Sequence, residues 1–255
     1  MGMIESLQTT NLDTIQKDCL KYLKFSADAL HQNVNYFLDT SKFECGMLEL
    51  FMKPFSLYEL ADRLVHTYQY AVVDKEVEMA LDYNVRDSVR NFIGDDFRIR
   101  QIIANLLSNA VKYTDAGTIT THIGSEILSC GSHLVRVSVV DTGKGIPEPA
   151  LVKLFDAFTQ FDGDARRKFS GTGLGLYLCK KLSKLMEGDV SVESNVGQGS
   201  TFSFTVKLAP YSGEEMLEAT VRNDARGNEG IVSEDAVSNE SLHQRMYRIL
   251  IVEDN

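Results

Sequence analysis

One amphipathic stretch, Asp95 to Thr114, constrains the fold more than any other part of the chain. At about 100° per residue, its apolar side chains share one broad side of a helix, which predicts that this side is buried. These side chains belong to Ile102, Ile103, Leu106, Leu107, Ala110 and Val111. The opposite side carries a narrow polar stripe of Gln101, Asn105, Asn109 and Lys112. Such a stripe is common on solvated helices, but its carboxamide oxygens and cation also suit a magnesium-triphosphate group.

Charge and hydropathy limit the class of protein. The 255-residue chain has a formal charge of −10 and 44% hydrophobic residues, enough for one substantial core with extensions. No run of about 18 apolar residues predicts a membrane span, and no secretory signal is expected at the N-terminus. The acidic balance argues against a nucleic-acid partner, because a phosphate backbone favours a basic surface. We expect a cytoplasmic location, whether or not a parent protein is anchored in a membrane.

The cysteines indicate a reducing compartment. Cys19, Cys45, Cys130 and Cys179 are widely separated and form no CxxC pair. This spacing favours free thiols over a disulfide framework or a metal site.

A long helix is predicted from Leu12 to Lys42, because apolar residues recur there in alternating steps of three and four. The seam consists of Leu20, Leu23, Ala27, Leu30, Val34 and Phe37. Such a helix either packs along the edge of a globular domain or pairs with another helix or a second subunit. Homodimerisation through this helix is therefore one of two expected arrangements.

Apolar runs separated by turn residues predict the other elements. Before the Asp95 helix they are a short strand Met47 to Phe51, a helix Ser56 to Asp74, and strands Val77 to Tyr83 and Ser88 to Ile93. After it come an Ala116-Gly117 turn, a hairpin of strands Thr118 to Ile127 and Leu134 to Val140, and a helix opening at Pro147. A helix Gly173 to Glu187 and strands Asp189 to Ser194 and Thr201 to Leu208 follow.

The order of these elements predicts an α/β (α+β) two-layer sandwich over residues 47–210, in which helices back one face of a mixed sheet. The long dimerisation-type helix precedes it in residues 1–46. The polar, charged residues 157–172 are expected to form a lid over a ligand, because long loops inside compact domains are often functional. Residues 211–246 have the composition of a flexible acidic linker, and residues 247–255 resemble a single strand followed by an acidic pair.

Three glycine-rich segments carry further chemistry. Asp141 to Pro147 (DTGKGIP) places a carboxylate after an apolar strand, where it can accept a hydrogen bond from an exocyclic amine such as that of adenine. Its glycines would let the backbone approach a flat ligand closely. Gly171 to Leu176 (GTGLGL) opens a helix, whose free amides and positive dipole end favour phosphate. It follows a charged loop and not a strand, which disfavours a dinucleotide fingerprint. Gly197 to Phe202 (GQGSTF) forms a turn into a strand.

Taken in this order, the segments resemble the ATP-binding catalytic domain of sensor histidine kinases, in the gyrase/histidine-kinase ATPase superfamily. NLLSNAVKYT resembles the N box, DTGKGIP the first glycine box, FDAFTQF at Phe155 to Phe161 the F box, GTGLGL the second glycine box and GQGSTF a third. Upstream, LDTSKFECGMLEL resembles the join between the second dimerisation helix and the catalytic domain. Downstream, YRILIVEDN resembles the start of a receiver domain, which implies a hybrid kinase acting in a two-component phosphorelay.

This resemblance implies ATP and Mg²⁺ as ligands. Asn109, assisted by Asn105, would coordinate magnesium, while Lys112 would contact phosphate and Tyr113 would pack beside the nucleotide. Arg167 in the lid would lie near the γ-phosphate; its neighbours Arg166 and Lys168 are more typical of a solvated loop.

For the base and the phosphates, the resemblance implies two further groups of residues. Asp141 would bind the adenine amine, and the base pocket would be shaped by Gly143, Gly145, Ile146 and Thr201. The second glycine box would hold phosphate through Gly171, Thr172, Gly173, Leu174, Gly175 and Leu176.

Two departures from the family pattern bear on function. Related gyrase and mismatch-repair ATPases place a water-activating Glu where this chain has Asn105, so phosphoryl transfer is favoured over hydrolysis. In addition, no histidine has the HExRTP-like context of the phosphate acceptor; the five are His31, His66, His122, His133 and His243. Because MIESL at the N-terminus resembles the tail of the first dimerisation helix, we expect the acceptor outside this chain and no autophosphorylation of this fragment alone.

The sequence therefore predicts a protein-histidine kinase domain that transfers the γ-phosphate of ATP to a His on another segment or chain. A receiver domain of the parent protein would be the next partner. Two alternatives are a pseudokinase-like module that binds nucleotide without phosphotransfer, and a water-activating ATPase of the same superfamily.

Overall fold

The computed structural model describes residues 6–7, 10, 12–85, 89–159 and 173–211. Residues 1–212 form a first unit. Residues 213–255, which include nearly all of the predicted linker and the predicted receiver segment, lie outside the described residues. The predicted domain limits thus stay predictions.

The first unit contains a seven-stranded mixed sheet. Its strands are β1 (Lys53–Ser56), β2 (Glu76–Asn84), β3 (Asn91–Gly94), β4 (Ala116–Ile127), β5 (His133–Asp141), β6 (Val190–Asn195) and β7 (Gly199–Pro210). The spatial order is β1-β3-β7-β5-β4-β2, and β6 also pairs with β7. Strands β2 and β4 run parallel and every other pair is antiparallel, so the predicted mixed sheet and the predicted β4–β5 hairpin are confirmed.

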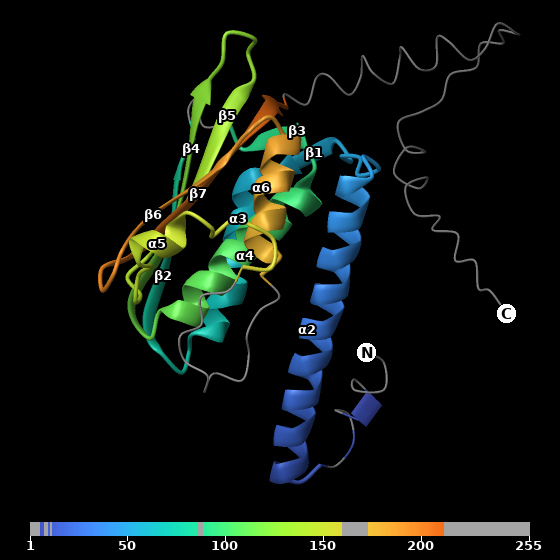
Figure 1. Ribbon diagram of the computed structural model, residues 1–255, viewed down its shortest axis with the longest axis vertical. Helices are drawn as coiled ribbons and strands as arrows, with labels where there is room; N and C mark the ends of the chain where they lie inside the picture. Colours follow the sequence, from blue (N-terminus) through green and yellow to red (C-terminus); the bar gives the residue numbers. More distant parts are fainter. Residues whose placement is uncertain (1–5, 8–9, 11, 86–88, 160–172, 212–255) are drawn as a thin grey trace, which may run out of the picture. The chain divides into compact units, whose positions relative to one another are not determined.

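Helices cover one face of this sheet, as predicted (Figure 1). They are α3 (Leu57–Ala71), α4 (Asp96–Tyr113) and α6 (Gly175–Leu185); α5 (Glu148–Leu151) is a single turn, and α2 (Thr14–Glu44) is the long N-terminal helix. Helix starts are explained by side-chain caps, because the first amide groups of a helix have no partner within it. Asp13 and Gln16 form a capping box on α2, while Ser56 caps α3.

The core lies between the sheet and these helices. Strand β5 alternates along its length, so that Val135, Val137 and Val139 are buried against the apolar side of α4. Ile102, Ile103, Leu106 and Leu107 of that side have no exposed surface. Full burial of each such side chain stabilises the fold by about 1.5–3 kcal/mol, so α4 is the central packing element that its periodicity predicts.

Three local predictions are wrong, all at the edges of elements. Residues 47–51 form no strand; β1 begins at Lys53 and includes Pro54, which an edge strand tolerates because one of its sides needs no amide donors. Ala116 and Gly117 are the first residues of β4 and not a turn, because they pair with β2 from Glu76 onward. Strand β3 begins at Asn91, later than predicted.

Helix α2 leaves most of its apolar seam uncovered. Leu23, Leu30 and Phe37 are 58%, 65% and 62% exposed. Other residues of α2 do contact the domain: Tyr36 is buried in the core, and Asp39 forms an ion pair of 2.7 Å with Arg98 of α4 and accepts a hydrogen bond from Gln101. Gln101, predicted within the polar stripe of α4, therefore contacts α2.

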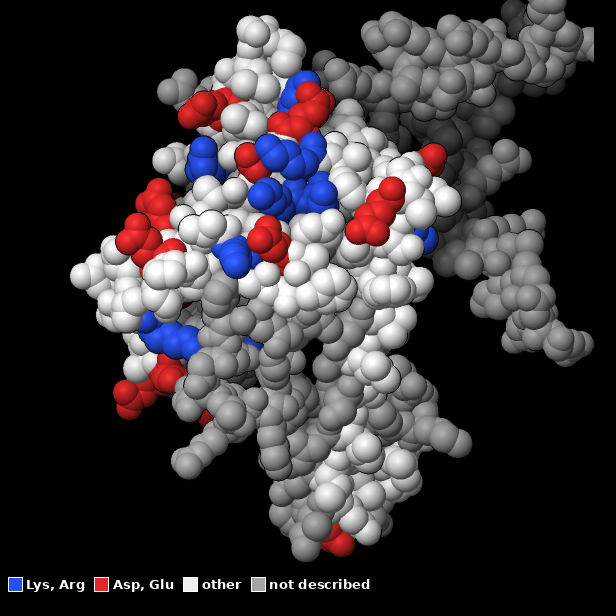
Figure 2. All heavy atoms as spheres, in the orientation of Figure 1, with Lys and Arg blue, Asp and Glu red and all other residues white. Residues whose placement is uncertain are grey.

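The described surface carries charges of both signs. On the face drawn in Figure 2, basic side chains lie in small groups flanked by acidic ones. Among the helices of the described residues, none combines the length and the hydropathy that crossing a bilayer requires. All four cysteines are free thiols, as predicted, and only Cys179 is buried.

Candidate nucleotide-binding site

Asp141 is the buried carboxylate of the candidate site. It ends β5, where its side chain is 6% exposed, and its Oδ1 accepts a hydrogen bond of 2.9 Å from the amide of Gly143. Burial raises the pKa of this carboxyl group above its ordinary value, and the backbone amides of Gly143 and Ser200 lower it to a smaller extent. A carboxylate held in this way remains an acceptor for a polar hydrogen of a ligand.

The glycines around Asp141 make room for neighbouring backbone. A Cβ atom on Gly143 would collide with the carbonyl oxygen of Tyr113, one on Gly145 with that of Asn195, and one on Gly199 with that of Asp141 itself. Gly145 also has φ +68°, a conformation that side chains disfavour. The predicted need for glycine is thus explained by packing within the protein, whereas the sequence argument attributed it to close approach of a ligand.

Ser194 joins the loop that follows Asp141 to the β6–β7 turn, a role that the sequence did not reveal. Its Oγ accepts a hydrogen bond of 2.8 Å from the amide of Ile146 and donates one of 2.8 Å to the carbonyl of Gly199. The amide of Gly197 donates to the carbonyl of Lys144 at 2.8 Å. Two glycine-rich turns that are separate in sequence, the Asp141–Pro147 loop and the β6–β7 turn, therefore share one hydrogen-bonded wall. Thr201 lies beside this wall, paired with Val140.

Two lysine side chains, of Lys112 and Lys144, lie over the ring of Tyr113 at the end of α4 and form the Tyr113 cation group. The Nζ atoms of Lys112 and Lys144 lie 4.8 and 4.5 Å from the centre of the half-buried Tyr113 ring. Asn109, one turn before Tyr113, is also half-buried. Sequence reasoning identified Lys112, Tyr113 and Asn109 but not Lys144, because the amide of Lys144 reaches the Tyr113 carbonyl only through the fold.

Asn105 is turned toward helix α6. Its side chain is buried and its Nδ2 donates a hydrogen bond of 3.2 Å to the Sγ of Cys179, while its Oδ1 lies against Gly175. The four residues of the predicted polar stripe therefore divide between three surroundings: Gln101 contacts α2, Asn105 contacts α6, and Asn109 and Lys112 are half-buried near Tyr113.

The start of α6 lies beside the Phe155–Thr159 segment. The amide of Phe158 donates to the carbonyl of Gly173 at 3.1 Å, and Gly173 has φ +70°. Leu174 is buried and Leu176 is half-buried. Among the described residues, no side chain caps the first amides of α6, which fits a site for an anion. Arg166, Arg167, Lys168, Gly171 and Thr172 lie outside the described residues.

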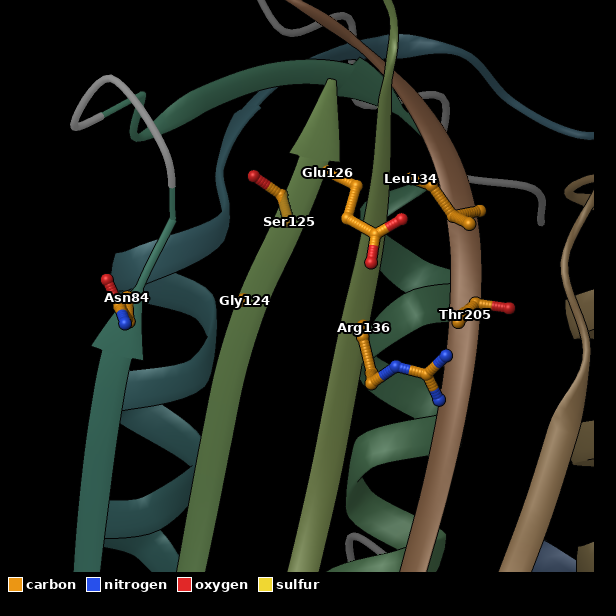
Figure 3. Close-up of a pocket in the computed structure, with 7 residues that line it drawn as sticks. All are labelled: Asn84, Gly124, Ser125, Glu126, Leu134, Arg136 and Thr205. Carbon is orange, nitrogen blue, oxygen red and sulfur yellow. The ribbon is translucent and has the colours of Figure 1, made fainter. Parts of the chain in front are cut away.

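A separate hollow of about 300 Å³ lies on the sheet face that carries no helices (Figure 3). It opens because Gly124 of β4 has no side chain between Asn84 of β2 and Arg136 of β5. None of the residues that line it belongs to the Asp141 loop or to α4. We therefore take the Asp141 wall, and not this hollow, as the candidate site.

Known proteins match the chain over the same region. The family described as histidine kinase-, DNA gyrase B-, and HSP90-like ATPase matches residues 94–210. Hybrid signal transduction histidine kinase B of Dictyostelium discoideum is 39% identical over 208 residues, covering 81% of this chain and 10% of that protein. The histidine-protein kinase BarA of Escherichia coli K12 is 40% identical over 209 residues, covering 82% of this chain and 22% of that protein.

A solved structure supports the same relationship. Full-length ShkA in complex with AMPPNP has a TM-score of 0.64 and 31% identity, covering 83% of this chain and 43% of that chain. Residues 94–210 are therefore a domain of the histidine kinase-, DNA gyrase B- and HSP90-like ATPase type, and the relatives that match it are named as histidine kinases. The chain spans only about a tenth to a fifth of the two kinases named above.

Proposed function

We propose that this chain binds Mg-ATP and serves as the catalytic domain of a cytoplasmic hybrid histidine kinase, transferring the γ-phosphate to a histidine outside the chain. The observation that carries the proposal is the buried Asp141 carboxylate, set in a glycine-rich wall beside the Tyr113 cation group. A carboxylate for an amine and cations for phosphates are the complementary groups that an adenine nucleotide requires.

Adenine would lie against the Asp141 wall. Asp141 would accept the hydrogen bond of the exocyclic amine, with Thr201 as a second polar contact. Gly143, Gly145 and Ile146 would form the surface against which the base packs. The amides of Gly143 and Ile146 donate to Asp141 and Ser194, and Gly145 packs against the carbonyl of Asn195, so this surface is formed by contacts within the protein.

The triphosphate would extend from Tyr113 toward the start of α6. Lys112 would contact phosphate, Gly171, Thr172, Gly173, Leu174, Gly175 and Leu176 would supply the amide-rich turn, and Arg167 would lie near the γ-phosphate. These roles follow the family resemblance. The described support for them is that no side chain caps the α6 amides, which a phosphate can then satisfy.

Asn109 would hold Mg²⁺, and Asn105, the predicted helper, would have to turn its Oδ1 away from Gly175 to assist. The described residues contain no group of three His, Cys, Asp or Glu side chains that could bind a metal by themselves. This donor set fits magnesium, which commonly takes one or two protein oxygens and completes its shell with water and nucleotide phosphates. When bound, the ion would neutralise negative charge on the phosphate oxygens.

The chemical step would be a displacement at the γ-phosphorus. The bond to the β–γ bridging oxygen breaks, an imidazole nitrogen of the acceptor histidine forms the new P–N bond and releases its proton, and ADP leaves. Positioning and charge stabilisation would supply most of the acceleration. Because Asn105 is no base, a water-activating ATPase is not favoured, and relatives named as kinases argue against a pseudokinase.

The acceptor is proposed to lie on the dimerisation helix of the parent protein or of a partner chain. Of the described histidines, His133 is 3% exposed and packs on Phe92, and His122 lies on the sheet beside Asp82. His243 lies outside the described residues. A receiver domain of the parent would accept the phosphoryl group next.

Calorimetric titration with AMPPNP, with and without Mg²⁺, tests the nucleotide site. Asp141→Asn and Asn109→Ala should each weaken Mg-AMPPNP binding about tenfold or more, because each removes a charge-assisted or metal-linked contact. Asn84→Ala, in the hollow on the other sheet face, should bind as the wild type does. Folded wild-type protein that binds no AMPPNP would overturn the proposal. Transfer itself would appear as acid-labile phosphohistidine on an added acceptor-helix protein.

A further inference from the structure

Asn105 and Cys179 form a polar contact inside an otherwise apolar helix interface. Asn105 on α4 is 9% exposed and Cys179 on α6 is 3% exposed, and the Nδ2 of Asn105 donates to the Sγ of Cys179 at 3.2 Å. The sulfur of Cys179 is the acceptor for this buried amide group, and a buried donor without an acceptor would be destabilising.

Gly175 completes this contact at the first residue of α6. If Gly175 had a Cβ atom, its nearest neighbours would be the Oδ1, Cγ and Nδ2 atoms of Asn105. Gly175 does not have a positive φ, so its backbone conformation is open to other residues. The glycine is required here by space: the Asn105 carboxamide occupies the volume that a side chain would fill.

We propose that Asn105, Cys179 and Gly175 form a clamp between α4 and α6, and that Cys179 is a positioning residue for the phosphates of the bound nucleotide. The inference deepens the proposed function and rests on it, because it concerns how the same site holds its ligand. Asn105 is the clamp residue on α4, and it precedes Asn109 by one helical turn and Lys112 by two.

The clamp sets the spacing between two parts of the phosphate site. Asn109 and Lys112 approach the triphosphate from α4, while the uncapped amides approach it from the first turn of α6. A shift of α6 along α4 would move the amides but leave Asp141 and its wall unchanged, since that wall is held by β5, β6 and β7. The clamp should therefore affect phosphate binding and leave adenine binding nearly unchanged. This role needs no bond between Asn105 and magnesium.

Three variants on α6 separate this role from general packing. Cys179→Val removes the acceptor and replaces the thiol by an apolar side chain with one more heavy atom, and Cys179→Ser keeps an acceptor. Leu182→Val removes one methylene from a fully buried side chain one turn further on and is the control for packing. Affinities for Mg-AMPPNP and for adenosine would be measured on the full 255-residue chain by calorimetry, together with the thermal midpoint.

Cys179→Val should weaken Mg-AMPPNP binding about 3–10-fold, the equivalent of one ordinary hydrogen bond, and should change adenosine binding less than about twofold. Cys179→Ser should recover most of the AMPPNP affinity. Leu182→Val should lower the thermal midpoint without changing the ratio of the two affinities. The positioning role would be overturned if Cys179→Val left the ratio of the Mg-AMPPNP affinity to the adenosine affinity unchanged, whether or not both affinities fell.

A double-mutant cycle measured without nucleotide tests the clamp independently of the proposed function. In urea unfolding, Asn105→Ala and Cys179→Val should be non-additive, with a coupling of about 2–10-fold in the unfolding equilibrium constant. Additive effects of the two substitutions would contradict the clamp even if the chain binds nucleotide. Coupling in a chain that binds no nucleotide would instead overturn the proposed function, and the positioning role with it.

Discussion

At Asp141, the requirement for binding opposes the requirement for stability. Desolvation raises the pKa of its carboxyl group, with smaller opposing effects of the Gly143 and Ser200 amides, so the folded chain holds the Asp141 proton more tightly than the unfolded chain does. Its contribution to stability is therefore most favourable below the ordinary pKa and is lost as pH rises through the folded value. At neutral pH the ionised Asp141 carboxylate lowers the folding stability of the ligand-free chain. Such a cost is typical of a residue whose role is to bind a ligand.

Asp141→Asn should accordingly raise stability at neutral pH while it weakens nucleotide binding. The carboxamide can still accept the Gly143 hydrogen bond but carries no buried charge. In ligand-free thermal melts at pH 7, we expect a midpoint about 2–4 °C above the wild type, the shift that about 1 kcal/mol produces in a domain of this size. The difference should shrink as pH falls. Asp74→Asn, at an exposed position, is the control, and a lower midpoint for Asp141→Asn would contradict the argument.

The sequence predicted the residues of the site better than it predicted their contacts. Asp141 and its glycines stand out because an acidic residue and unusual backbone freedom are visible in a local string. Ser194, Lys144 and Cys179 were missed because their partners, Ile146, Tyr113 and Asn105, come from other elements. A serine at a strand end or a cysteine in an apolar helix gives no local signal of what it will contact.

Among the elements, α4 begins at an N-cap residue, Asp95, whose side chain hydrogen-bonds to two segments of the chain. Both carboxylate oxygens of Asp95 are used: Oδ1 accepts from the amide of Arg98 at 3.0 Å, and Oδ2 accepts from the amide of Phe51 at 2.9 Å. The side chain is 4% exposed. Asp95 thus caps α4 and also fixes the extended segment that connects α2 to β1.

Asp95→Ala should destabilise the chain by about 2–4 kcal/mol, the sum of a lost helix cap and an unpaired amide. The neighbouring Asp96→Ala removes an ion pair with Lys53, whose side chain is 48% exposed, and an acidic charge in the first turn of α4. It should change stability by about 1 kcal/mol, less than Asp95→Ala does. Urea unfolding of both variants gives the comparison. Similar values for the two would show that Asp95 does not anchor the 47–52 segment.

Long periodic elements were predicted closely and short edge strands were not. Helix α4 and strands β4 and β5 each bury one side, so their periodicity is imposed by the core and appears in the sequence. Strand β1 is four residues long and its place is determined by pairing with β3, a partner that local patterns do not reveal. The mistaken strand at 47–51 reflects an apolar run whose Leu48 is buried without entering the sheet.

For the whole molecule, the order of elements was sufficient to predict a mixed sheet backed by helices, because few topologies bury those faces. It did not predict that β6 and β3 pair with the same strand, β7. Nor did it predict that the N-terminal helix would contact α4 through Asp39 and Arg98. These relations depend on side chains far apart in sequence.

The exposed seam of α2 bears on the arrangements predicted for that helix. Within the described residues, Leu23 and Leu30 are exposed, which disfavours the packing-edge arrangement and favours pairing with another helix or with a second copy. We predict the second copy. Sedimentation velocity should then show a dimer at micromolar concentration. Leu23→Glu combined with Leu30→Glu should weaken the dimer at least about a hundredfold, because each leucine contributes about 1.5–3 kcal/mol when buried.

Lys17→Glu is the matched control, since it changes the net charge of the same helix by the same amount, two units, at an exposed position outside the seam. Its dimer should remain near wild-type strength. If both variants dissociate equally, charge repulsion and not the apolar seam governs association. If the wild type is already monomeric at about 100 μM, α2 does not dimerise this chain by itself and the prediction is wrong.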